Sequence, residues 1–168
     1  MKEGHHEAQD FVAGLRSDSH IIHNMKVVID TNVVVAGLRS STGASYRILE
    51  LIADDAVDFA ISVPLFLEYE DVLKRPAMRR ALKLSVKEVD TVLDVLATKS
   101  SHVKLHFLWR PQLRDSNDEM VLEAAVNAGA DAIVTFNRAD FLPAATAFSL
   151  AVIYPKEYLN RMTRRTSP

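Results

Sequence analysis

An apolar run of β-branched residues ends abruptly on a carboxylate in the segment Lys26-Val-Val-Ile-Asp-Thr-Asn32. Runs of this kind are typical of strands buried on both faces of a parallel sheet. Open parallel sheets bind ligands at their carboxyl edge, where such a strand delivers its polar residue. Asp30 is therefore the first candidate functional residue, although an aspartate after a strand also serves as a helix cap or turn residue.

The rest of the chain alternates strands with helices. Strands are predicted at residues 26–30, 57–62, 102–105, 132–135 and 150–153. Helices are predicted at residues 33–38, 48–54, 64–75, 116–128 and 155–162, and a further helix is predicted to begin at Ser85 and to extend at least to Leu96. This alternation implies right-handed crossovers and a parallel sheet covered on both faces, which is a three-layer α/β/α sandwich.

Local signals mark several helix boundaries. Thr31 or Asn32 is the expected N-cap of the first helix. Capping-box patterns begin at Ser85 and at Ser116. The helix that begins at Ser85 is predicted to bury the stripe Val86, Val89, Leu93 and Leu96. Pro76 is predicted to end the helix at residues 64–75.

Composition indicates one ordinary globular domain. The chain has 168 residues, a net charge of −2 and no cysteine, which excludes disulfides, thiolate nucleophiles and zinc–cysteine sites and fits a reducing cytoplasm. No apolar run approaches the roughly 20 residues of a membrane span, and the start lacks the apolar core of a signal peptide. We expect a flexible extension at residues 1–24, a domain at 25–162 and a basic tail at 163–168.

A second candidate carboxylate is Asp118. It aligns with the apolar face of its helix and is predicted to point inward, whereas Glu119 and Glu123 are predicted to face solvent. The helix dipole favours a carboxylate in a first turn, but an inward-pointing charge also needs a partner. Function is therefore the preferred interpretation of Asp118.

The remaining candidates lie on the third helix and after the fourth strand. Glu68 and Glu70 flank the apolar centre of one helix, and helical phase alone does not choose between them. Asn137 and Asp140 reach the same sheet edge as Asp30 if the first and fourth strands are neighbours. A turn would favour the same two residue types.

Taken in order, four motifs closely resemble those of PIN domains. They are Val28-Ile-Asp-Thr-Asn32, Ser62 followed by Glu68 on a helix, Asp118-x-x-Val-Leu-x-Ala-Ala-x-x-x-Gly129-Ala, and Val134-Thr-x-Asn137-x-x-Asp140-Phe. The resemblance covers about residues 25–160 and is greatest for bacterial and archaeal toxin components of toxin–antitoxin pairs, which are broadly VapC-like ribonucleases. It implies a five-stranded parallel sheet of order 3-2-1-4-5, with a switch point between strands one and four.

The same resemblance implies an activity and partners. It implies an endoribonuclease that hydrolyses RNA phosphodiester bonds with Mg²⁺ or Mn²⁺, a cognate antitoxin protein and a homodimer. Hard divalent cations take oxygen ligands, and they offset the mutual repulsion of converging carboxylates. A bound cation also acidifies a water for attack on the phosphodiester.

By resemblance, the catalytic and metal-binding carboxylates are Asp30, Glu68 and Asp118, and Asn137 or Asp140 completes the metal site. Many relatives carry an aspartate where this chain has Asn137. An amide oxygen still coordinates a metal but brings no charge, which weakens a second metal site unless a nearby acid compensates.

Supporting positions are also assigned by resemblance. Thr31, Asn32 and Thr135 match small polar positions that orient the carboxylates or a bound water. Asp140 and the nearby Asp115 are the two acids that would compensate for Asn137. Substrate contacts should be cationic, and the candidates for RNA phosphates are Arg39, Arg114 and Arg138. The alternative for each arginine is a solvated surface charge, given the nearly neutral chain.

Three other functions were weighed. A catalytically weak or inactive PIN-like module that binds RNA or a protein partner is favoured by Asn137. A phosphatase with Asp30 as nucleophile would need a second aspartate two residues later, where this chain has Asn32. A phosphate-binding loop would need a glycine-rich motif that the sequence lacks.

Overall fold

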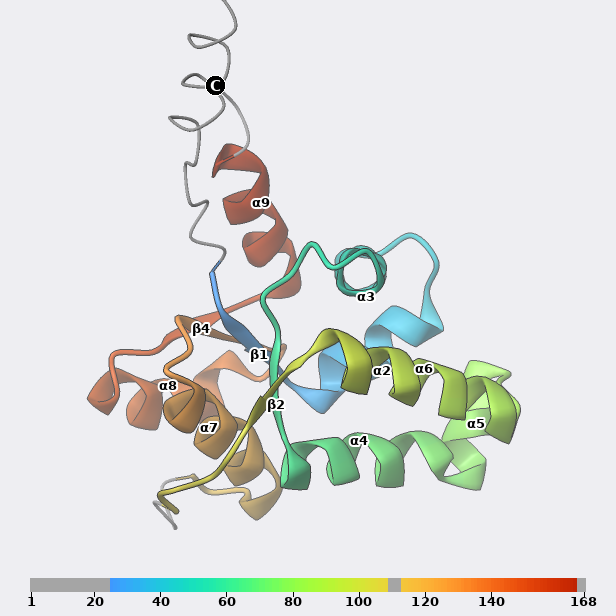
Figure 1. Cartoon of the computed structure of the whole chain (residues 1–168), viewed down its shortest axis with the longest axis horizontal. Coiled ribbons are helices and arrows are strands. Elements are labelled where there is room, and N and C mark those ends of the chain that lie inside the picture. Colours follow the sequence, from blue (N-terminus) through green and yellow to red (C-terminus); the bar gives the residue numbers. More distant parts are fainter. Residues whose placement is uncertain (1–24, 109–112, 166–168) are drawn as a thin grey trace, which may run out of the picture.

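A computed structural model describes residues 25–108 and 113–165, which form an α/β fold (Figure 1). The strands each have three residues: β1 (Val27–Ile29), β2 (Ala60–Ser62), β3 (Ser101–Val103), β4 (Ala132–Val134) and β5 (Ala151–Ile153). The helices that alternate with them are α2 (Thr31–Arg39), α3 (Ala44–Ala53), α4 (Val63–Lys74), α5 (Pro76–Leu82), α6 (Val86–Lys99), α7 (Ser116–Ala128), α8 (Arg138–Ala147) and α9 (Pro155–Arg165).

All the strand pairs are parallel, but the strands form two sheets instead of the single predicted one. One sheet has the order β1-β4-β5, and the other pairs β2 with β3. An isolated parallel bridge joins Val27 to Phe59, and the Val27 amide donates to the Asp58 carbonyl at 2.9 Å. The two sheets therefore meet beside β1, without the continuous ladder that a five-stranded sheet of order 3-2-1-4-5 requires.

The core lies around the strands of the larger sheet. Every residue of β1 and β4 is fully buried, as the apolar runs predict for strands with both faces covered. Figure 1 shows α7 and α8 on one side of the strands and α2, α4, α5 and α6 on the other. Helices thus flank the strands on both sides, as the alternating pattern predicts.

Several local predictions agree with the structure and others need correction. The capping box is confirmed, because Ser85 N donates to Glu88 Oε2 at 2.8 Å and Glu88 N donates to Ser85 Oγ at 3.2 Å. Val86 was predicted to be buried but is 48% exposed, in the first turn of α6. Pro76 ends α4 as predicted and also begins α5, where a proline is tolerated because a first-turn amide needs no helical acceptor.

Two further differences concern helix starts. The N-cap position of α2 is Asp30, rather than Thr31 or Asn32, which lie inside the helix. Helix α8 was not predicted, because Pro143 and four alanines give it no clear apolar stripe. Its placement directly after β4 positions Asn137 and Asp140.

Some predictions fall outside the described residues. The expected extension at residues 1–24 and the last residues of the expected tail, 166–168, are among them, whereas α9 continues to Arg165. Across the part of the chain that the structure describes, no helix combines the length and apolar character needed to cross a bilayer.

Candidate active site

Asp30 lies at the carboxyl end of β1, where its side chain is 5% exposed. The Thr135 hydroxyl, at the end of the neighbouring strand β4, donates to Asp30 Oδ2 at 2.6 Å. Asn32 Nδ2 donates to Thr135 Oγ1 at 3.4 Å, and Asn32 Oδ1 accepts from the Phe136 amide at 3.3 Å. The side chains of Asn32 and Thr135 therefore position this carboxylate between the ends of β1 and β4.

Burial and hydrogen bonding act in opposite directions on Asp30. Burial raises the pKa of its carboxyl above the ordinary value, while hydrogen bonds from Thr135, Asn32 and the Thr31 amide lower it. Burial is the larger effect, so the net pKa is raised. The carboxylate is held in place by neutral donors, which leaves its charge uncompensated by any basic group among the described residues.

Asp118 is half-buried in the first turn of α7. Its pKa is raised from 3.8 to about 6, first by burial and then by the negative charges of Asp30, Asp115, Asp140 and Glu119. Charges affect one another to this extent only at short range, especially where water is partly excluded. Residues that are far apart in the sequence thus share one negatively charged region.

Glu68 joins this region from α4. Burial raises its pKa, Arg75 lowers it, and Asp71, Asp115 and Asp30 raise it further. Glu70 lies on the other side of the same helix and pairs with Lys74 at 2.7 Å. The ambiguity between the two glutamates is therefore resolved by their surroundings, and Glu68 is the one that lies near Asp30.

The fourth candidate position lies where β4 leads into α8. The Asn137 amide donates to Thr135 Oγ1 at 2.9 Å, and Asn137 occupies the N-cap position of α8 with an exposed side chain. Asp140 is exposed in the first turn of α8 and contributes to the raised pKa of Asp118. Both candidates lie at the edge that holds Asp30.

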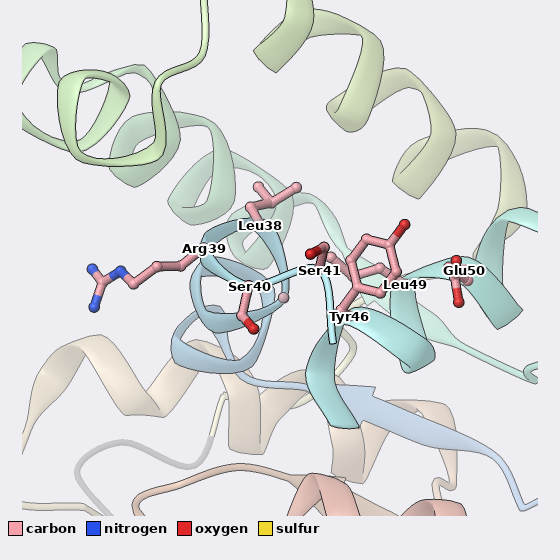
Figure 2. Close-up of a pocket in the computed structure, with 8 residues that line it drawn as sticks. Leu38, Arg39, Ser40, Ser41, Tyr46, Leu49 and Glu50 are labelled. Atoms are coloured by element: carbon pink, nitrogen blue, oxygen red, sulfur yellow. The ribbon is translucent and has the colours of Figure 1, made fainter. Parts of the chain in front are cut away.

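The three candidate arginines lie at different distances from the acidic region. Arg138 directly follows Asn137, and the exposed Arg114 directly precedes Asp115. Arg39 ends α2, a nine-residue helix that begins just after Asp30, so about 12 Å of helix separates the two. Arg39 is also one of the residues that line a cavity of about 460 Å³ between α2 and α3. Figure 2 shows its side chain pointing away from Tyr46 and Glu50.

Two acidic residues of α7 differ from their prediction. Glu119 and Glu123 were expected to face solvent, but they are only 2% and 1% exposed. The segment before α7 covers this face, and the Leu113 amide donates to Glu119 Oε1 at 2.9 Å. Helical periodicity did not predict the burial of Glu119 and Glu123, because it takes no account of chain segments that pack over a helix.

The donor set fits a hard divalent cation in its chemistry, because it offers carboxylate oxygens that raise one another's pKa. The arrangement is open, however. Within residues 25–108 and 113–165, no three acidic or histidine side chains lie close enough together to hold a metal ion. Binding a cation would therefore have to draw Asp118 and Glu68 towards Asp30.

Comparisons with known proteins give a family and a fold. A family model described as PIN domain matches residues 26–139. A chain in the crystal structure of VapBC2 from Rickettsia felis, bound to a DNA fragment from its promoter, is similar with a TM-score of 0.50 at 17% sequence identity. The alignment covers 77% of this chain and 98% of that one, and at this identity it shows a shared fold. No curated protein matches the chain.

Proposed function

The chain belongs to the PIN domain family, and from this premise we propose that it is a metal-dependent endoribonuclease, the toxin component of a toxin–antitoxin pair. The observation that supports the proposal is that carboxylates at the end of β1, on α4 and on α7 raise one another's pKa. Asp30 and Asp115 each raise the pKa of both Glu68 and Asp118. Carboxylates that raise one another's pKa are costly to the fold when ionised, and a bound cation would reduce that cost.

In this proposal each residue has a role set by its position. Asp30, Glu68 and Asp118 are the catalytic carboxylates and, with Asn137 and Asp140, supply the oxygen ligands for Mg²⁺ or Mn²⁺. Thr135 and Asn32 hold Asp30 in place by hydrogen bonds, and the amide of Thr31 adds to them. The bound cation supplies the charge that acidifies an attacking water and offsets charge on the leaving oxygen.

The remaining proposed contacts concern substrate. Arg138 and Arg114, which are adjacent in sequence to Asn137 and Asp115, are the proposed contacts to RNA phosphates beside the acidic region. Arg39 is assigned to a more distant phosphate, since it lies at the far end of α2. Asp115 adds negative charge close to Asp118 and compensates for the neutral amide of Asn137.

The test is cleavage of a mixed pool of single-stranded RNA by purified protein. We expect cleavage with Mn²⁺ or Mg²⁺, none with EDTA, and none from Asp30→Asn, Glu68→Gln or Asp118→Asn. The control is Asp94→Asn, which changes an exposed carboxylate on α6 and should leave cleavage unchanged. Cleavage that persists in EDTA or in Asp30→Asn would refute the assignment.

A second candidate function is a PIN-like module that binds RNA or protein without cutting. Asn137 favours it, because an amide replaces the charge that a fourth carboxylate would bring. The open arrangement of the acidic side chains also favours it. RNA binding without cleavage at any divalent-ion concentration would support this alternative, and restored cleavage in Asn137→Asp would identify the amide as the cause.

A protein partner is part of the first proposal. Val63 and Leu67, on the outer face of α4, are 71% and 54% exposed. Beside them lies a cavity of about 250 Å³, lined by residues that include Phe66, His102 and Val103. We assign this apolar surface to a cognate antitoxin, and expect Leu67→Asp to weaken co-purification with an antitoxin encoded beside the gene. Dimerisation of the toxin is a separate expectation, to be checked by light scattering.

A further inference from the structure

Two large aromatic side chains are exposed at the same edge of the larger sheet. Phe136 follows β4 and is 47% exposed, and Tyr154 follows β5 and is 43% exposed. The strand residues just before them, Val134 and Ile153, are almost completely buried. An aromatic ring is thus exposed to solvent where each of these strands leaves the core. Exposed apolar groups beside a polar site commonly mark a binding surface.

The two aromatic residues follow neighbouring strands of the larger sheet. Val134 pairs with Ile153 in the parallel ladder, and the Thr135 amide donates to the Ile153 carbonyl at 3.0 Å. Thr135 is therefore level with Tyr154, and Phe136 follows one residue later. Both aromatic residues are thus exposed on the surface at the carboxyl edge of the larger sheet.

This surface adjoins the acidic region. The Phe136 amide donates to Asn32 Oδ1 at 3.3 Å. Asn32 also donates to Thr135 Oγ1, and the same hydroxyl donates to Asp30. A chain of three hydrogen bonds consequently links the backbone of Phe136 to the carboxylate at the centre of the candidate active site.

Arg138 completes the surface. Its guanidinium carbon lies 5.8 Å from the centroid of the Tyr154 ring, within the range of a cation–π contact. Its Nε is buried and has no hydrogen-bond partner among the described residues, and Nη1 is 3.8 Å from Glu157 Oε2. The guanidinium is therefore oriented by the ring, and the Arg138 side chain as a whole remains 40% exposed to solvent.

We propose that Phe136 and Tyr154 stack against bases of a single-stranded RNA, and that Arg138 contacts the adjoining phosphate. This inference rests on the proposed nuclease function and names the form in which its substrate binds. Stacking on aromatic rings is tolerant of sequence and does not depend on the charge of the protein. A chain of net charge −2, with an acidic site, has little bulk attraction for RNA and needs uncharged contacts of this kind.

A single-stranded RNA oligonucleotide containing 2-aminopurine tests the stacking directly, because stacking on an aromatic ring quenches its fluorescence. We expect quenching by the wild-type protein, and a loss of affinity of about 5- to 100-fold for each of Phe136→Ala and Tyr154→Ala. Phe136→Tyr and Tyr154→Phe keep a ring and should bind as the wild type does. Val86→Ala removes a similarly exposed apolar side chain at the start of α6 and is the matched control.

An abasic RNA separates stacking from other losses. Removing one base at a time while keeping the backbone should weaken wild-type binding at one or two positions, and the alanine variants should show no further loss there. Equal losses on base-bearing and abasic RNA would overturn the inference. So would unchanged RNA affinity combined with weakened self-association or antitoxin binding, which would make the rings a protein interface.

Failure of the stacking proposal can be distinguished from failure of the proposed nuclease function, because RNA binding is measured both with Mn²⁺ and with EDTA. Ring-dependent quenching without any cleavage would support the stacking surface and refute the nuclease proposal. Metal-dependent cleavage, combined with unchanged RNA affinity of both alanine variants, would support the nuclease proposal and refute the stacking surface. Circular-dichroism melting of each variant shows that a loss of binding does not arise from unfolding.

Discussion

Replacing Asp118 by asparagine should stabilise the metal-free protein and abolish cleavage. The pKa of Asp118 is raised from 3.8 to about 6 by burial and by the negative charges around it. A shift of that size corresponds to about 3 kcal/mol for a fully isolated group, at 1.36 kcal/mol per pKa unit. The side chain is only half-buried, so solvent screening reduces the expected gain to about 1 kcal/mol.

The sign of the effect depends on pH. Below about pH 4 the carboxyl is protonated in both the folded and the unfolded chain, and the substitution should change little. Between pH 4 and about 6 the unfolded chain releases its proton first, so the wild type loses stability as the pH rises. Above about pH 6 the full penalty is present, and Asp118→Asn gains its full advantage.

Urea denaturation in EDTA at pH 4.5 and pH 7.5 measures this difference. We expect a higher free energy of unfolding for Asp118→Asn at pH 7.5 and a much smaller difference at pH 4.5. A modest offset comes from the N-terminus of α7, which favours a negative charge in its first turn. The exposed Asp94→Asn control should show no such pH dependence. Equal or lower stability of Asp118→Asn at pH 7.5 would refute the view that this carboxylate is held there at a cost.

Three further predictions concern the same site and its support. Thr135→Val removes the donor to Asp30 and should lower the free energy of unfolding by about 1–3 kcal/mol. The same substitution should raise the Asp30 pKa, so the acidic limb of the pH–rate profile should move to higher pH. Millimolar Mn²⁺ should raise the melting temperature of the wild type but not of Asp30→Asn, and equal shifts would place the ion elsewhere. Gly37→Ala should cost about 1–3 kcal/mol by urea denaturation, because its Cβ would lie 2.6 Å from Leu49 Cδ1 and 2.9 Å from the Ser45 carbonyl.

The structural features that sequence alone predicted are those that depend on residues close together in the chain. The apolar runs locate β1 and β4, and the pair Ser85 and Glu88 predicts a capping box whose reciprocal hydrogen bonds are present. Asp30 was identified as the polar residue after a buried strand, and Thr135 by its resemblance to a small polar position of PIN domains. Their 2.6 Å contact follows once β1 and β4 are paired.

The features that sequence missed depend on contacts between distant elements. Sheet continuity between β1 and β2 is one, because strands of only three residues leave little ladder on which to extend a sheet. The choice between Glu68 and Glu70 is another, since Lys74 pairs with Glu70 at 2.7 Å and also with Asp90 of α6 at 2.9 Å. Asp90 belongs to another helix, and helical phase within α4 contains no information about it.

The acidic residues of helix α7 have different surroundings. An amphipathic helix is expected to leave one face in water, but here the segment before α7 covers that face. The amides of His106 and Phe107 donate to Asn127 Oδ1 at 2.9 and 3.1 Å, and the Leu113 amide donates to Glu119 Oε1.

A buried carboxylate or amide on this face is therefore an acceptor for backbone amides that would otherwise be unsatisfied. Asp118 precedes Glu119 by one residue and is turned towards the sheet edge, where the neighbouring groups are other carboxylates. Glu119 thus holds the covering segment by its hydrogen bond, whereas Asp118 gains no comparable partner within the described chain. That contrast is the physical reason for assigning metal binding to Asp118 rather than to its more deeply buried neighbour.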